Sequence, residues 1–234
     1  MSNYFTLAGV ASTVYNTYIA TSNMFDAPER SVETVRVPGR NGALTLDNGR
    51  YENFAGSVTA YIPNGLTSHI DDLRSWLLSV PGYRRYEEAL RPDEYRMARY
   101  VGPFKVDNSD RVGAAFTLSF DCKPQRFLKT GETAVTLTED GSITNPTLFE
   151  ARPLIRVYGT GTLGVRAETI TISTNPGYID IDCEMMDAYY GAVNCNGYIE
   201  LSSGEFPVLA PGYNGIILGS GITQVDITPR WWTL

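Results

Sequence analysis

The stretch Pro153-Leu154-Ile155-Arg156-Val157-Tyr158-Gly159 places two β-branched residues, Ile155 and Val157, two positions apart and ends at a glycine. This alternation is typical of a half-buried strand, because successive side chains of a strand point to opposite faces. The pattern recurs at Ile170/Ile172, Ile179/Ile181, Ile199/Leu201, Ile216/Leu218 and Val225/Ile227. Turn clusters separate these pairs every ten to eighteen residues, which predicts an antiparallel β-sandwich in this half of the chain.

The preceding half is also rich in short strands, but one segment has a helical period. Phe116, Leu118 and Phe120 alternate with polar residues and predict a strand. Between residues 66 and 80, apolar residues recur at steps of three and four, which predicts an amphipathic helix that lies across a sheet. We expect Thr67 and Ser68 to cap its start and Pro81-Gly82 to end it.

Two turn signals follow a strand predicted at residues 31–37, where Val32 and Val35 break strict alternation and suggest a bulge. Pro38-Gly39-Arg40-Asn41-Gly42 predicts a turn or an extended loop. Asn48-Gly49 is a strong hairpin signal, because both residues readily take the positive φ that a tight hairpin turn requires.

Composition and charge set the class of the protein. Of the 234 residues, 43% are hydrophobic and 19% charged, which excludes wholesale disorder. No run approaches about 18 apolar residues, so we expect no membrane insertion.

Charge is distributed unevenly along the chain. Residues 1–127 hold 14 basic and 14 acidic residues, whereas residues 128–234 hold 5 basic and 12 acidic residues. This shift predicts two domains, 1–130 and 131–234, and neither is basic enough to bind nucleic acid by its field.

Few residues suggest catalysis or metal binding. Asp180, Asp182 and Glu184 share one face of a predicted strand, which fits a calcium site, a glycosidase pair, or simply a solvated or subunit-facing surface. His69 is the single histidine, and no Gly-x-Ser-x-Gly motif accompanies it. We therefore expect no enzyme activity, no cofactor and no metal.

Three cysteines without a CxxC spacing indicate free thiols and synthesis in a reducing cytoplasm.

The motif Gly159-x-Gly161-x-x-Gly164 matches the dinucleotide-binding fingerprint. That function requires a helix directly after the glycines, so that the pyrophosphate lies at the helix N-terminus. The residues that follow are β-branched and typical of a strand. The pattern therefore favours glycines that serve a tight hairpin.

Two further groups are candidate contact residues. Arg84, Arg85, Arg91, Arg96 and Arg99 occur among acidic neighbours, which is typical either of a solvated face or of subunit contacts, and we take them as subunit-interface candidates. Trp231 and Trp232 close the chain. Adjacent aromatic rings can stack on a sugar, although burial in a core is the commoner use of such residues.

The sequence resembles the distal tail protein family of long-tailed, siphovirus-type bacteriophages, along essentially the whole chain. In the first half, the resemblance rests on residues 37–42, 47–52, the helical segment with Tyr83-Arg84-Arg85, and residues 116–124. In the second half it rests on Asn145-Pro146, residues 153–159, residues 204–209, Pro211-Gly212-Tyr213-Asn214 and Pro229-Arg230-Trp231-Trp232. The order and spacing of these motifs carry the match.

The resemblance implies a mainly β protein. Its N-terminal domain would be a β-barrel or split β-sandwich with one α-helix, similar to tail-tube subunits, and its C-terminal domain a galectin-like antiparallel β-sandwich. Six copies would form a ring at the tail tip, or baseplate, of the virion, assembled in the host cytoplasm. The ring would join the major tail tube protein to a tail-associated fibre or lysin protein, pass DNA through its channel, and dock receptor-binding proteins at its periphery.

The residues themselves leave a second function open. In that alternative, the C-terminal sandwich is a carbohydrate-binding module that contacts host cell-wall polysaccharide through Trp231 and Trp232. The family resemblance favours the structural ring, whereas adjacent aromatic residues at the end of a sandwich favour the module.

Overall fold

The computed structural model describes residues 3–109 and 112–234, and it confirms the mainly β fold class. The chain divides into two compact units, which we call unit 1 (Met1–Arg126 together with Leu234) and unit 2 (Phe127–Thr233). Each unit encloses its own cluster of buried apolar side chains. The three short 3-10 helices among the described residues span Ser12–Tyr15, Lys129–Glu132 and Asn196–Tyr198.

Unit 1 is built on one antiparallel sheet, whose strand path is β2-β1-β7-β8-β10-β6-β3. These strands are β1 (Phe5–Leu7), β2 (Val10–Ala11), β3 (Tyr18–Ser22), β6 (Phe54–Ile62), β7 (Arg84–Glu88), β8 (Glu94–Tyr100) and β10 (Ala114–Leu128). A further strand of this unit, β9 (Lys105–Ser109), also pairs with β10, and the last strand of the chain is β22 (Trp232–Thr233). The predicted alternation in β10 is confirmed, because Phe116, Leu118 and Phe120 are fully buried.

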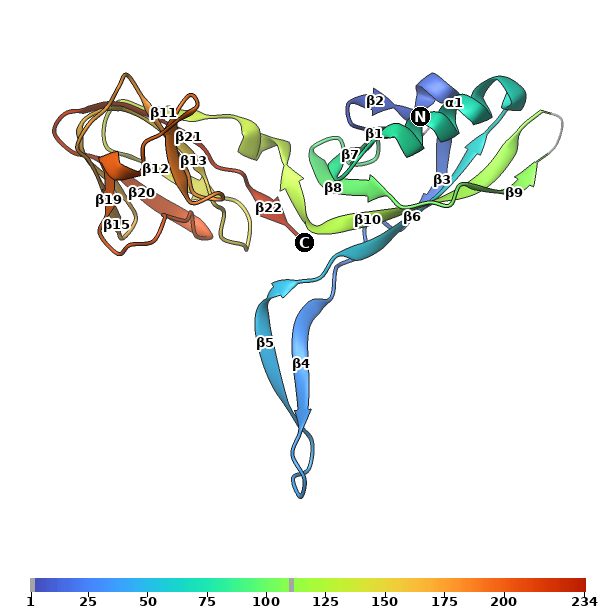
Figure 1. Cartoon of the computed structure of the whole chain (residues 1–234), viewed down its shortest axis with the longest axis horizontal. Coiled ribbons are helices and arrows are strands. Elements are labelled where there is room, and N and C mark those ends of the chain that lie inside the picture. Colours follow the sequence, from blue (N-terminus) through green and yellow to red (C-terminus); the bar gives the residue numbers. More distant parts are fainter. Residues whose placement is uncertain (1–2, 110–111) are drawn as a thin grey trace. The chain divides into compact units, whose positions relative to one another are not determined.

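The predicted helix is α1 (Leu66–Ser79), which lies on one face of this sheet (Figure 1). Its buried side chains are Leu73, Trp76 and Leu77, and the ring of Trp76 stacks on that of Phe5 in β1. The predicted cap is wrong. The helix starts after Gly65, which has a left-handed backbone, and no side chain caps it; Thr67 and Ser68 are already helical.

A long two-stranded hairpin, β4 (Arg30–Arg36) and β5 (Ala43–Tyr51), extends away from the sheet of unit 1 (Figure 1). The turn at Pro38–Gly42 joins its strands, and a register shift between Arg30 and Val32 confirms the predicted bulge. The hairpin predicted at Asn48-Gly49 is wrong. Both residues lie inside β5, where the positive φ of Gly49 (70°) serves the bulge rather than a turn.

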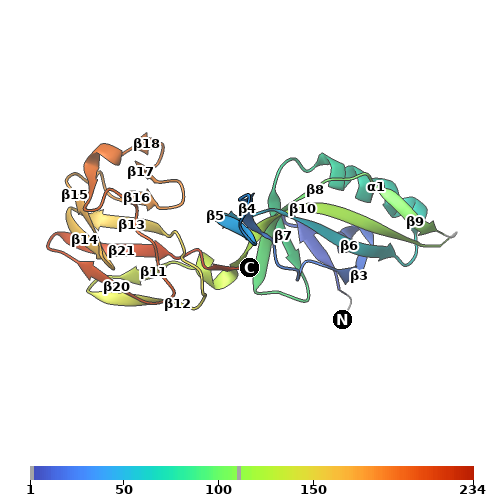
Figure 2. The same cartoon turned by 90° about the horizontal axis from the view of Figure 1, so that it is seen from below.

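Unit 2 is a β-sandwich of two antiparallel sheets, which form two layers in Figure 2. Its six-stranded sheet, counted over the described residues, contains β11 (Val135–Leu137), β21 (Ile222–Thr228), β13 (Leu154–Gly159), β16 (Ile179–Asp182), β17 (Asp187–Tyr190) and β18 (Val193–Asn194). The facing sheet contains β12 (Gly141–Asn145), β20 (Gly212–Leu218), β14 (Gly161–Val165), β15 (Glu168–Ile172) and β19 (Ile199–Leu201). Every apolar pair predicted from residue 155 onward lies in one of these strands.

The glycine motif at residues 159–164 serves a crossover between sheets, not the tight hairpin expected from sequence. β13 ends at Gly159 in one sheet, and β14 begins at Gly161 in the other. The connection from β20 to β21 crosses at the same place, and the Thr160 N–H donates to the Gly221 carbonyl at 3.2 Å. A Cβ on Gly159 would lie 2.1 Å from that carbonyl oxygen, so only glycine allows the two backbones to approach this closely.

Replacing Gly221 by alanine should lower the free energy of unfolding by at least about 2 kcal/mol, because its φ of +94° is strained for any other residue. A Cβ there would also lie 2.1 Å from the Thr160 carbonyl oxygen. Denaturant unfolding of the full chain measures the loss. Gly197→Ala is the matched control, since no atom lies within 4 Å of its Cβ position, and an equal loss in both variants would contradict the argument.

Candidate interaction surfaces

The β4–β5 hairpin has one apolar face. The register pairs Val35 with Leu44 and Glu33 with Leu46, so these four side chains lie on the same side of the ribbon. The opposite side carries the pairs Thr34/Thr45, Val32/Asp47 and Arg36/Ala43. We call the side with Val35, Leu44 and Leu46 the apolar hairpin face.

This face is uncovered. Val35 is 43% exposed, Leu44 42% and Leu46 55%, although such residues are normally buried. An isolated two-stranded ribbon is marginally stable in water, because it has no layer against which to bury its apolar side chains. The apolar hairpin face is therefore a candidate interaction surface.

Most of the five candidate arginines are held by partners within unit 1. Arg91 pairs with Glu94 at 2.9 Å, Arg99 pairs with Asp121 at 2.9 Å, and Arg85 pairs with Glu87. Their guanidinium groups also lie over aromatic rings of the same unit: Arg85 over Tyr95, Arg91 over Phe25, and Arg99 over Tyr83.

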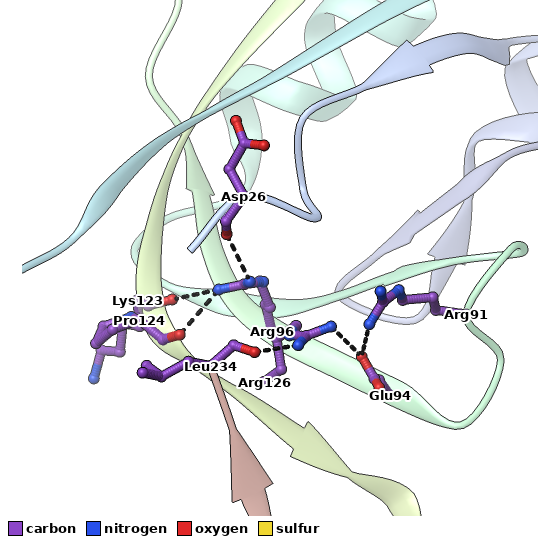
Figure 3. A network of polar contacts seen from close by, with 8 residues as sticks. All are labelled: Asp26, Arg91, Glu94, Arg96, Lys123, Pro124, Arg126 and Leu234. Atoms are coloured by element: carbon purple, nitrogen blue, oxygen red, sulfur yellow. Dashed lines mark hydrogen bonds and ion pairs between the residues drawn. The ribbon is translucent and has the colours of Figure 1, made fainter. Parts of the chain in front are cut away.

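Arg96 is the most buried of the five, with 3% of its surface exposed. It donates to the backbone carbonyls of Pro124 (3.0 Å), Asp26 (3.4 Å) and Lys123 (3.5 Å), as Figure 3 shows. Burial lowers its pKa to about 10. Arg96 thus ties β8 to the end of β10 and to the segment before β4, which is a structural role inside the unit.

A second arginine linkage lies beside it in Figure 3. Glu94 accepts from both Arg91 (2.9 Å) and Arg126 (3.1 Å), and Arg126 also donates to the carbonyl of Leu234. Of the five candidates, Arg84 is exposed and has no ion pair with any described residue. The assignment of the five arginines to a subunit interface stays a prediction, and Arg84 is the member free to act in one.

The two tryptophans do not form a paired platform. Trp231 is 5% exposed and packs in the core of unit 2, so neither face of its ring is open to a sugar. Trp232 stacks on Phe149 with 4.5 Å between ring centroids, and its Nε1–H donates to the Glu150 carbonyl at 2.9 Å. The sequence could not distinguish these uses, because adjacent residues of a strand point to opposite faces.

The carboxylates of β16 are matched with arginines. Asp180 accepts two bonds from Arg156, at 2.7 and 2.9 Å, and Asp182 accepts two from Arg230, at 2.7 and 2.9 Å. The Arg230 guanidinium holds the pKa of Asp182 below its usual value. These bidentate pairs leave no pair of free carboxylates for calcium or for glycoside hydrolysis, and within the described residues no cluster of His, Cys, Asp and Glu could hold a metal ion.

The face of the unit 1 sheet opposite α1 is lined by small polar residues. In its two adjacent strands β6 and β10, Thr59 faces Thr117 and Ser57 faces Ser119. Thr117 donates to Asp107 at 2.9 Å, and the ion pairs of Arg85 and Arg99 lie on strands of the same sheet. This surface offers hydroxyl groups and two arginines paired with carboxylates, together with the exposed Lys105, which lies opposite Thr117 in β9.

The remaining sequence features have structural positions. His69 lies in the first half of α1, beside Gly65. Cys122, Cys183 and Cys195 are buried free thiols, and burial raises the pKa of Cys122 and of Cys183 to about 12. Over the described part of the chain, we find no helix with the length and apolar character of a membrane span.

The fold, with one helix on a sheet in unit 1 and a sandwich in unit 2, is that of the distal tail proteins of long-tailed phages. The structure of the SPP1 Dit protein (gp 19.1) matches this chain with a TM-score of 0.78, over 100% of both chains and at 14% sequence identity. That protein is described as a paradigm of the hub adsorption apparatus in phages that infect Gram-positive bacteria. The resemblance found in the sequence is thus confirmed at the level of the fold. No protein-family model and no curated protein matches the sequence.

Proposed function

We propose that this chain is a structural hub at the tail tip of a phage virion. Six copies form a ring through unit 1, assembled in the host cytoplasm, and the ring joins the tail tube to a tail-associated fibre or lysin protein. The fold shared with the SPP1 hub protein supports this role, as do the matched carboxylates, which favour a structural function over a catalytic one.

The apolar hairpin face is the observation that carries the proposal. In a closed ring, each copy presents the same hairpin to its neighbour, and every apolar face is covered at once. Burying three half-exposed side chains stabilises each contact by roughly 1 kcal/mol per side chain, before the cost of ordering. Around a ring these contributions repeat at every interface.

The hydroxyl-lined sheet face of unit 1 supports the passage of DNA. A DNA backbone binds where many free lysines and arginines release its counterions, and two arginines of this face, Arg85 and Arg99, are paired with carboxylates. We place this face, with Ser57, Thr59, Thr117 and Ser119, toward the channel. DNA would then slide past it without being held.

The experiment that tests the ring is light scattering after gel filtration of the full chain. We expect a particle of about 155 kDa, which is six times the 25.8 kDa chain, and sixfold rings in negative-stain images. A monomer at every concentration, including in the presence of purified tail-tube protein, would contradict the proposal.

The alternative function, a carbohydrate-binding module built on Trp231 and Trp232, is not favoured, because the Trp231 ring is buried.

A further inference from the structure

Tyr213 is an exposed aromatic residue in a defined position. It projects from β20 on the outer face of the five-stranded sheet of unit 2, and 73% of its surface is exposed. Its ring leans over Gly215: a Cβ on that glycine would lie 3.6 Å from Cε1 and 3.7 Å from the hydroxyl oxygen of Tyr213. Because Gly215 has no side chain, the Tyr213 ring lies over its backbone on one side, and the other side of the ring is exposed to solvent. A ring positioned in this way loses little conformational entropy when a ligand stacks on it.

Polar groups flank the ring on both sides of β20. On β12, Thr144 lies opposite Tyr213 and Ser142 lies opposite Gly215, and both are exposed. Past the end of β14, the backbone N–H of Arg166 donates to the Gly215 carbonyl at 2.9 Å. Ser142, Gly215 and Arg166 therefore form a row across three neighbouring backbone segments. Hydroxyl groups both donate and accept hydrogen bonds, and a guanidinium adds five N–H donors.

Arg166 occupies a position that favours glycine. It is the first residue of the two-residue turn between Val165 and Glu168, and its φ is +56°. A non-glycine residue in this conformation costs free energy, and residues held in such conformations cluster at binding and active sites. Arg166 is exposed and has no ion pair with any described residue, whereas Arg156 and Arg230 are both paired.

The surrounding face carries almost no charge. The other outward positions of the paired strands in this sheet are mainly Thr, Gly and Ile. Among these paired outward residues, Glu200 is the one carboxylate. Residues 128–234 nevertheless contain 12 acidic and 5 basic residues, so their net charge of −7 repels polyanions. A ligand that suits this face is flat, apolar on one side, rich in hydroxyl groups at its edge, and uncharged.

We propose that Tyr213, Arg166, Ser142 and Thr144 form a binding site for a neutral saccharide. The C–H face of a pyranose ring stacks on the open side of Tyr213. The sugar hydroxyls exchange hydrogen bonds with Ser142 and Thr144 and accept from the Arg166 guanidinium. The site belongs to unit 2 and does not depend on ring formation by unit 1, so it adds a binding function to the hub role.

An array of neutral oligosaccharides, with carboxylate- and phosphate-bearing ones beside them, tests the site on the full chain. We expect binding to neutral members, about tenfold weaker for Tyr213→Ala and little changed for Tyr213→Phe, which keeps the ring. Arg166→Gly relieves the turn strain, so its folded state is at least as stable, yet it should weaken binding severalfold.

Tyr190→Ala is the control, because it removes a partly exposed aromatic residue from the other sheet and should not change binding. Absence of binding to every neutral saccharide would overturn the proposal. So would binding confined to the anionic members, or neutral binding that Tyr213→Ala and Arg166→Gly leave unchanged.

Discussion

Replacing Leu44 and Leu46 together by aspartate should convert the proposed ring into monomers of 25.8 kDa without unfolding the chain. Both side chains lie on the apolar hairpin face and touch no core, so the change leaves the fold intact. In the ring, each new carboxylate would be buried without a partner, which costs several kcal/mol per interface. Light scattering after gel filtration, at matched protein concentrations, measures the change in mass.

The opposite side of the same ribbon supplies the control. Ala43 and Thr45 lie on the polar side of the same strand, so Ala43→Asp/Thr45→Asp introduces the same two charges at nearly the same distance from the turn. We expect this variant to assemble like the unmodified chain. Equal loss of assembly in both variants would mean that charge on the ribbon, rather than the apolar face, controls self-association. Full assembly of the Leu44→Asp/Leu46→Asp variant would contradict a role for the face.

Replacing Arg230 by alanine should lower the free energy of unfolding by about 3–5 kcal/mol, because it leaves the Asp182 carboxylate buried without its counterion. Asp182 also accepts the backbone N–H groups of Glu184 and Met185, so the turn after β16 depends on its orientation. Denaturant unfolding measures the loss. Arg152→Ala is the control: Arg152 is exposed and unpaired among the described residues, and its loss should change stability by less than about 0.5 kcal/mol.

The same ion pair predicts an acid transition. The pKa of Asp182 is lower in the folded chain than in the unfolded one, so the unfolded state binds the proton more readily. The pair therefore contributes its full stability above the unfolded pKa and loses it as the pH falls through the folded pKa. The difference in stability between the unmodified chain and Arg230→Ala should shrink as the pH falls through that range. A difference that stays constant would contradict the assignment.

Local periodicity predicted much of the fold. The pairs Ile155/Val157 and Ile216/Leu218 lie in strands, and Leu73, Trp76 and Leu77 form the buried face of α1, because burial imposes a period of 2 on strands and 3.6 on helices. The same reasoning could not predict how strands pair. Asn48-Gly49 has the composition of a hairpin turn, but β5 runs through it and stays paired with β4 as far as Tyr51, so the glycine serves a bulge.

Long-range contacts account for most of what the sequence left open. The carbonyls of Pro124 and Asp26 bind Arg96 from positions far along the chain, and no pattern around Arg96 reveals its burial. The sequence predicted a strand that contains Val35 and a turn signal that follows Leu44 and Leu46. It could not show that the structure provides no layer to cover them, because an uncovered face is a property of the whole fold.

The three buried thiols make the hairpin accessible to measurement. Cys122, Cys183 and Cys195 are each at most 2% exposed, so a reagent in solution does not reach them, and the raised pKa of Cys122 and Cys183 leaves little of their reactive thiolate. A maleimide dye would therefore couple selectively to a cysteine introduced at Asn41, in the exposed tip of the hairpin. Fluorescence from that position would test whether one subunit docks on the next as proposed, with every natural cysteine left in place.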